Sequence, residues 1–211
     1  MSVTITDYGY RSDDATWDNG YLVNPALRLL LTALAPPATV FELGCGNGHF
    51  SGLTQATGYR VTAVDPSSSG VAQAQARHPD GIFAEARVED DLPGRFGRFS
   101  AVVSLEVIEH CYSAQVFARQ LHALLQPGGT AIVSTPYHGY WKYLALALSG
   151  RLGRHMDPLW EGGHIKFFTE VHLRRLFAAS GFEDIRTYRA GRWLPAFAKS
   201  IIVVARRPPS Q

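Results

Sequence analysis

Cysteine is scarce in this 211-residue sequence, which contains only Cys45 and Cys111. Disulfide scaffolds usually carry more cysteines in a much shorter secreted chain, so both thiols are expected to be reduced, as in a cytoplasmic protein. An excess of one charge is also lacking, because 20 Lys and Arg residues face 18 Asp and Glu residues. This balance argues against the broad basic surface of a nucleic-acid-binding protein, and no nucleic-acid partner is expected.

Long hydrophobic runs are absent as well. Nowhere do about 18 apolar residues follow one another, as a membrane-spanning helix requires, and the first residues have neither the basic flank nor the apolar core of a secretion signal. Hydrophobic residues make up 46% and charged residues 18% of the chain, which is typical of a folded globular protein. The length suits a single domain over residues 1–211 and is too short for two ordinary catalytic domains.

The chain does contain an alternation of short β-branched runs with helical patterns, which predicts an α/β fold with a parallel sheet covered by helices. Its last two strands are separated by a short connection, which predicts an antiparallel hairpin that completes the sheet. The expected strands are 39–43, 60–64, 81–84, 100–104, 130–134, 182–188 and 200–205. The expected helices are 25–34, with Pro25 at its first position, 113–125, with Ser113 as its cap, and 170–179.

Two segments lie outside this alternation. An N-terminal helical segment of about residues 1–36 precedes the first strand. A segment of about residues 136–168 combines aromatic residues with several glycines and three histidines, and it is expected to face the substrate. Within it, residues 140–154 form a short apolar helix flanked by aromatic and basic residues. This helix could contact a membrane interface peripherally or cover a hydrophobic acceptor, and an ordinary lid helix is the alternative.

A glycine-rich turn follows the first expected strand. Its glycines, Gly44, Gly46 and Gly48, permit positive φ and let a ligand approach the backbone closely. The spacing G-x-G-x-G departs from the G-x-G-x-x-G of dinucleotide-binding turns. Glu42 precedes the turn, and Asp65 ends the next strand, where a carboxylate can accept both ribose hydroxyl protons. A nucleoside without phosphates suits this set better than NAD.

The segment Glu42-Leu43-Gly44-Cys45-Gly46-Asn47-Gly48 resembles the first motif of class I S-adenosylmethionine-dependent methyltransferases, and Leu125-Gln126-Pro127-Gly128-Gly129 is similar to that family's turn before strand five. The resemblance implies a Rossmann-like three-layer sandwich with a mostly parallel seven-stranded sheet ending in an antiparallel hairpin. It also implies S-adenosyl-L-methionine as the cofactor. The implied cofactor-binding residues are Glu42, Gly44, Cys45, Gly46 and Gly48 near the methionine part, Asp65 and Pro66 near the ribose, Val88 and Glu89 near the adenine, and Leu105 and Glu106 near the methyl group.

The end of the fourth expected strand reads Ser-Leu-Glu-Val-Ile-Glu-His over residues 104–110. It is similar to the corresponding segment of ubiquinone-biosynthesis O-methyltransferases and of the related type 11 methyltransferases. Ligands of open α/β sheets bind at the carboxyl ends of strands, so this segment should border the transferred methyl group. Glu106, Glu109 and His110 are spaced to share one side of a helical turn. No compact ligand set can be read from the sequence, however, and no required metal is expected.

A hydroxyl acceptor must lose a proton, and histidine has a suitable pKa to take it. The candidate bases are His164, which lies in the polar and aromatic cluster 161–168, His110 and His138. A histidine that only holds a loop by hydrogen bonds is the alternative. The sequence predicts methylation of a small-molecule acceptor, with a phenolic or lipophilic hydroxyl favoured. N- or C-methylation, NAD-dependent oxidoreduction and cofactor binding without catalysis remain open, and no oligomeric state is indicated.

Overall fold

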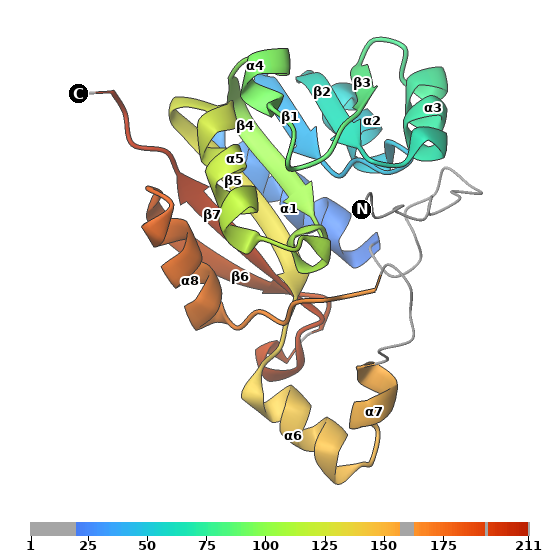
Figure 1. Cartoon of the computed structure of the whole chain (residues 1–211), viewed down its shortest axis with the longest axis vertical. Helices are drawn as coiled ribbons and strands as arrows, with labels where there is room; N and C mark the ends of the chain where they lie inside the picture. Colours follow the sequence, from blue (N-terminus) through green and yellow to red (C-terminus); the bar gives the residue numbers. More distant parts are fainter. Residues whose placement is uncertain (1–19, 157–162, 193, 211) are drawn as a thin grey trace.

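The computed structural model describes residues 20–156, 163–192 and 194–210 (Figure 1). Residues 1–19 of the expected N-terminal segment and residues 157–162 of the expected insertion lie outside these ranges. No helix within the described ranges is long and apolar enough to cross a membrane.

Seven strands form one sheet in the order β3-β2-β1-β4-β5-β7-β6. Strands β1 to β5 run parallel to one another, whereas β7 is antiparallel to both β5 and β6. This confirms the predicted mostly parallel sheet that ends in an antiparallel hairpin. The strands are β1 (Thr39–Leu43), β2 (Arg60–Asp65), β3 (Ile82–Glu85), β4 (Phe99–Leu105), β5 (Leu125–Pro136), β6 (Glu183–Ala190) and β7 (Ser200–Arg206).

Helices cover both faces of the sheet and complete a three-layer sandwich (Figure 1). One face packs against α1 (Gly20–Ala33), α2 (His49–Ala56) and α3 (Ser68–Arg77). The other face packs against α4 (Leu92–Phe96), α5 (Ala114–Leu124) and α8 (Glu170–Ala179). Two more helices, α6 (Tyr140–Leu148) and α7 (Leu152–His155), project beyond the carboxyl end of β5. The short 3-10 turns are η1 (Ile108–His110) and η2 (Pro195–Phe197).

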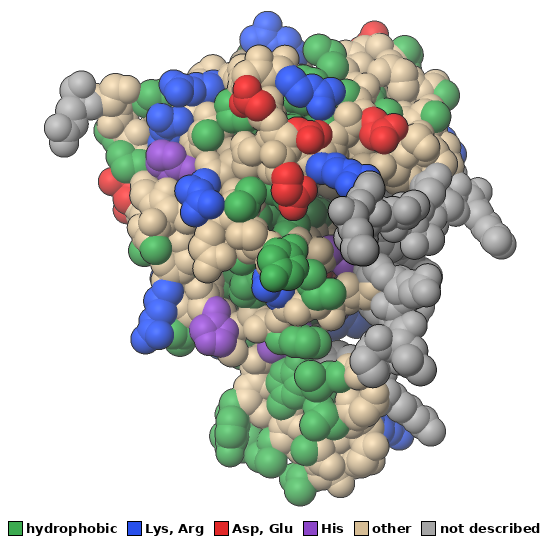
Figure 2. All heavy atoms as spheres, viewed as in Figure 1, with side chains coloured by type: hydrophobic (Ala, Val, Ile, Leu, Met, Phe, Trp, Pro, Cys, Tyr) green, Lys and Arg blue, Asp and Glu red, His purple; other side chains and the backbone are tan. Residues whose placement is uncertain are grey.

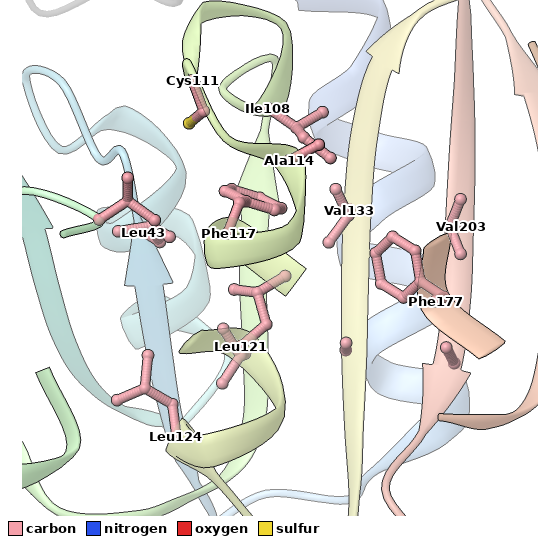
Figure 3. Packing of buried hydrophobic residues seen from close by; sticks show 14 of the residues in the cluster. Leu43, Ile108, Cys111, Ala114, Phe117, Leu121, Leu124, Val133, Phe177 and Val203 are labelled. Carbon is pink, nitrogen blue, oxygen red and sulfur yellow. The ribbon is translucent and has the colours of Figure 1, made fainter. Parts of the chain in front are cut away.

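The central strands are buried on both faces, which explains their nearly continuous apolar sequences. In β4, Val102 packs on the α5 side of the sheet, whereas Ala101 and Val103 pack on the α1 side. Figure 3 shows how Phe117 and Leu121 of α5 fill the space over the strands. Burial of each such side chain contributes about 1.5 to 3 kcal/mol. This packing provides a firm platform for the residues at the carboxyl edge of the sheet.

The predicted start of the first helix is wrong. Pro25 lies inside α1 and not at its first position. Proline removes one backbone hydrogen bond from a helix interior. The side chains of Leu22 and Val23 are nevertheless buried against the sheet, and this burial extends the helix toward the N-terminus.

The predicted start of the fifth strand is also wrong, because β5 begins at Leu125 and includes the expected turn at residues 127–129. Gly128 has a φ of 78°, and the pairing register with β4 shifts between Phe99 and Ala101. The turn is therefore an irregularity within a strand. The Ser113 cap of α5 is confirmed, since its hydroxyl accepts a hydrogen bond from the Val116 N–H at 3.2 Å.

Candidate functional site

A glycine-rich turn connects β1 to α2 at the carboxyl edge of the sheet. Gly44, Gly46 and Gly48 have φ values of 84°, 52° and 82°, a backbone conformation that other residues rarely adopt. A Cβ atom at Gly44 would also lie 2.3 Å from Cγ2 of Val107. The turn therefore packs directly against the chain that leaves β4, and its bare backbone permits close approach of a ligand.

Asp65, at the end of β2, is bound to this turn through its carboxylate. Its Oδ2 accepts a hydrogen bond from the Gly46 N–H at 2.8 Å, and its Oδ1 accepts one from the Ser67 N–H at 2.9 Å. A carboxylate oxygen can accept more than one hydrogen bond, so these backbone contacts are compatible with hydrogen bonds from ribose hydroxyls. Pro66 follows it and is half-buried. This geometry fits the ribose of a nucleoside cofactor.

Glu42, in β1, is buried and receives a hydrogen bond from the hydroxyl of Ser51 on α2. Burial raises the pKa of Glu42 to about 8, the Ser51 bond lowers it, and the charge of Asp65 raises it further. A cationic group beside Glu42 would restore its charge. The amine of S-adenosyl-L-methionine is such a group, so Glu42 fits the methionine end of this cofactor.

Both cysteines are free and buried, as expected for reduced thiols. Burial raises the pKa of Cys45 well above its usual value, and nearby carboxylates add to the effect. Burial and neighbouring carboxylates likewise raise the pKa of Cys111 to about 12. Neither thiol is therefore activated as a nucleophile, and Cys45 would serve a cofactor through its position in the turn.

The other residues predicted to contact the cofactor differ in their surroundings. Val88 is buried in the core on the α5 side of the sheet, whereas Glu89 is exposed. The pKa of Cys111 is raised mainly by burial and then by the negative charge of Glu89. Glu89, in the loop after β3, therefore lies near Cys111, the residue that follows η1. Leu105, the last residue of β4, is half-buried. The adenine contacts of Val88 and Glu89 and the contact of Leu105 remain predictions.

Glu106 follows β4 with a φ of 54°, a left-handed conformation that costs about 1 to 3 kcal/mol and clusters at functional sites. The Ser134 hydroxyl of β5 donates to its Oε1 at 2.7 Å, and the Ser200 hydroxyl of β7 donates to its Oε2 at 3.2 Å. Burial raises the pKa of Glu106 to about 7, while these bonds and the charge of Lys142 lower it. The carboxylate therefore faces β5 and β7, and a direct cofactor contact remains a prediction.

Glu109, His110 and His164 meet at η1. The Glu109 carbonyl accepts hydrogen bonds from the two N–H groups that follow His164, at 3.0 and 3.1 Å. His110 Nδ1 lies 3.2 Å from the carbonyl oxygen of Gly163, and the two imidazole rings meet edge to face at 5.0 Å. The structure thus brings together two of the three histidines predicted as bases, although they are far apart in the sequence.

The carboxyl group of Glu109 is fully buried beside these imidazoles. Thr135 donates to its Oε2 at 3.0 Å. Its Oε1 lies 3.9 Å from His164 Nε2 and has no hydrogen-bond partner in the described part of the chain. Burial, and then the charge of Glu106, raise the pKa of Glu109 well above its usual value. The neutral form of this carboxyl is therefore favoured, and a positive charge on or near His164 would shift it toward the ionised form.

The same cluster could also hold a divalent cation, because ligand atoms of Glu109, His110 and His164 all lie within 4.8 Å of one another. Imidazole nitrogen and carboxylate oxygen suit several divalent metals. Glu106 is not part of this group, since two serine hydroxyls bind its carboxylate. The absence of a required metal remains a prediction.

His138, the third candidate base, is buried and hydrogen bonded to the Tyr143 hydroxyl. Its ring stacks on Tyr143 with centroids 5.4 Å apart and meets Phe167 edge to face at 5.1 Å. These contacts join α6 to the segment before α8. They favour a structural role for His138 over proton transfer.

The model of a protein family described as "Methyltransferase domain" matches residues 17–187 of this sequence. The chain belongs to this methyltransferase family. A ubiquinone biosynthesis O-methyltransferase of Bradyrhizobium diazoefficiens is 35% identical over 115 residues, which cover 53% of this chain and 44% of that protein. The chain spans about half the length of the curated relatives it matches.

Solved methyltransferase structures share the fold. An S-adenosylmethionine-dependent methyltransferase from Mesorhizobium loti has a TM-score of 0.71 and 24% identity, covering 90% of this chain and all (100%) of that one. A 1,6-didemethyltoxoflavin-N1-methyltransferase from Burkholderia thailandensis, with bound S-adenosylhomocysteine, has a TM-score of 0.65 and 23% identity, covering 88% and 78%. The resemblance to class I methyltransferases and the Rossmann-like fold are confirmed. The match favours S-adenosyl-L-methionine over NAD as the cofactor class.

The sequence did not predict the hydroxyl residues that bind the glutamates of the candidate site. Each of them binds the carboxyl group of a glutamate that lies elsewhere in the sequence. Their one sequence signal is the pair Ser134-Thr135 near the carboxyl end of a strand. The missed residues are Ser51, Ser134, Thr135 and Ser200.

Proposed function

We propose that this protein transfers the methyl group of S-adenosyl-L-methionine to a hydroxyl of a phenolic or lipophilic small molecule. The observation that supports an oxygen acceptor is the cluster of His164, His110 and Glu109 beyond β4. Glu109 and His110 come two and three residues after Val107, whose side chain lies against the glycine turn. A proton acceptor and the cofactor-binding turn therefore share one edge of the sheet.

Bound S-adenosyl-L-methionine supplies an electrophilic methyl group on a sulfonium. The protein aligns the acceptor oxygen with it, at about 3 to 3.5 Å for an in-line displacement, and removes the hydroxyl proton. The His164 side chain is 29% exposed, so it can reach an acceptor while Glu109 remains enclosed. His164 takes the proton. The imidazolium that forms favours ionisation of the Glu109 carboxyl, whose Oε1 lies 3.9 Å from His164 Nε2, and the two opposite charges then stabilise each other.

The first test is calorimetric titration with S-adenosyl-L-methionine, S-adenosylhomocysteine and NAD in parallel. Binding of the two sulfur nucleosides without NAD is expected. Matched acceptors that differ only in the reacting atom, such as a phenol and the aniline of the same skeleton, then separate O- from N-methylation by mass spectrometry. An N- or C-methylated product alone would replace the hydroxyl acceptor, and cofactor binding without any product would support a non-catalytic role.

Variants at two histidines test the base. His164→Ala should lower kcat by about 10² to 10⁴-fold, the usual contribution of general-base catalysis, with little change in cofactor affinity. His172→Ala is the control, because this exposed histidine only caps α8. An unchanged kcat in His164→Ala would exclude His164 as the base.

A further inference from the structure

Helix α6 has an apolar sequence, YWKYLALAL, yet none of its nine residues is buried. Tyr140, Trp141 and Leu148 are 73%, 60% and 82% exposed. Trp141, Ala145 and Leu148 follow the i, i+4, i+7 spacing of one helical face, and all three are exposed. Figure 2 shows hydrophobic side chains gathered over this projection at the bottom of the molecule. An ordinary surface helix presents polar residues to solvent, so this apolar face requires an explanation.

The chain segments that flank this face are basic. Residues 136–156 and 188–210 contain several Lys and Arg residues and no Asp or Glu. These stretches meet in space, because α6 contacts η2. Burial is the first cause that lowers the pKa of Lys142 on α6, and the positive charges of Arg192 and Lys199 lower it further, whereas the buried Glu106 raises it. Positive charge therefore gathers at the base of the apolar helix.

Two exposed arginines complete the surface, which consists of α6, Arg151 and Arg192 and is called the α6 surface below. Neither arginine forms a salt bridge with any carboxylate in the described ranges. Aromatic and aliphatic residues flanked by basic residues are the composition of a helix that lies in a lipid headgroup region. Each such basic residue near an anionic membrane contributes about 1 kcal/mol of attraction.

We propose that the α6 surface docks this protein onto an anionic lipid bilayer. Nine residues of helix measure about 14 Å, less than half of the roughly 30 Å hydrocarbon core, so α6 lies in the interface and does not cross it. A second copy of the chain is disfavoured because like charges would face each other. Docking would bring the carboxyl edge of the sheet close to the membrane, where lipophilic acceptors reside. This last step rests on the proposed function.

The test is co-sedimentation of the full chain with vesicles of phosphatidylcholine alone or mixed with phosphatidylglycerol. Binding to the mixed vesicles, weakened by salt, is expected. Arg151→Glu and Arg192→Glu should each weaken it about fivefold or more, and Trp141→Ser with Leu148→Ser should abolish it. The matched controls are Ile82→Ser and Arg119→Glu, exposed residues on β3 and α5, which should bind as the unmodified chain does. Retained S-adenosylhomocysteine binding shows that each variant is folded.

Three results would overturn the proposal. One is equal binding to both kinds of vesicle or to neither. Another is unchanged binding of the Trp141→Ser, Leu148→Ser variant. The third is a concentration-dependent dimer, without lipid, that this variant abolishes, since the α6 surface would then belong to a second copy. Vesicle binding requires no methyl transfer, so failure of docking is distinguishable from failure of the proposed reaction.

Discussion

The Asp65 carboxylate holds the glycine turn through the Gly46 N–H, and we predict that it also accepts hydrogen bonds from the ribose hydroxyls. Asp65→Ala should therefore weaken S-adenosylhomocysteine binding by about 1 to 3 kcal/mol, the penalty for losing charge-assisted hydrogen bonds. Calorimetry at fixed pH measures the change. Asp80→Ala is the control, because Asp80 is an exposed acid beyond the end of α3. Equal affinity in the unmodified chain and Asp65→Ala would remove Asp65 from the site.

Glu42 makes folding sensitive to pH. Its pKa is raised, chiefly by burial, from 4.5 to about 8, so between these values the folded chain holds a proton that the unfolded chain releases. The free energy of unfolding must then fall as pH rises through this window. Glu42→Gln keeps an acceptor for the Ser51 hydroxyl and should flatten this slope, with a gain of up to about 5 kcal/mol above pH 8.

Urea denaturation across the same pH range, without cofactor, measures this slope. The comparison of Glu42→Gln with the unmodified chain isolates one carboxyl, because other titrating groups are common to both. Parallel stability curves for the two proteins would mean that Glu42 is already charged in the folded state.

At the scale of elements, the junction of η1 with the chain before α8 builds the candidate base. The Glu109 carboxyl has a strongly raised pKa, and a buried carboxyl without a cation neutralises by binding a proton. We therefore expect methyl transfer to survive dialysis against EDTA. The assay is product formation before and after dialysis and after adding back Mg²⁺, Mn²⁺ or Zn²⁺. Loss of activity that one of these ions restores would instead assign Glu109, His110 and His164 as metal ligands.

Periodicity predicted the elements well because each strand and helix carries its own pattern of burial. The seven strands, the α5 cap and the glycine turn all depend on residues that are close in sequence. The partners of the site carboxylates were not predictable in this way. Ser134 and Ser200 reach Glu106 only because β4, β5 and β7 are neighbours in the sheet, and this order cannot be derived from local spacing.

The left-handed backbone of Glu106 escaped prediction, whereas the apolar helix within residues 140–154 was expected either to contact a membrane interface, to cover an acceptor or to act as a lid. Glu106 has a φ of 54°, and the Ser134 hydroxyl of β5 accepts a hydrogen bond from its N–H and donates one to its carboxylate. An apolar helix is ordinarily expected to be buried, whereas α6 has no buried residue. The contacts of Glu106 join residues far apart in the sequence. The exposure of α6 reflects how little of the described chain packs against it. Neither feature can be derived from composition.

At the scale of the whole molecule, the two sides of the sheet carry different parts of the candidate site. The glycine turn follows β1 and Asp65 ends β2, on one side of β4. The projection formed by α6 and α7 extends from β5, on the other side (Figure 1). Parallel strands place both at the same edge, so a cofactor and an acceptor can meet near η1 while being bound by separate parts of the chain.

This division predicts that the projection can be replaced without loss of cofactor binding. Substitution of residues 140–156 by a Gly-Ser segment of equal length removes no fully buried α6 side chain, although it does remove the Tyr143 contact with His138. Calorimetry should therefore show S-adenosylhomocysteine affinity within about twofold of the unmodified chain, a difference under about 0.5 kcal/mol. Turnover of lipophilic acceptors should fall, because their docking surface is gone. A large loss of S-adenosylhomocysteine affinity would show that α6 and α7 also form part of the cofactor site, and the two halves of the sheet would then have to be treated as one binding unit.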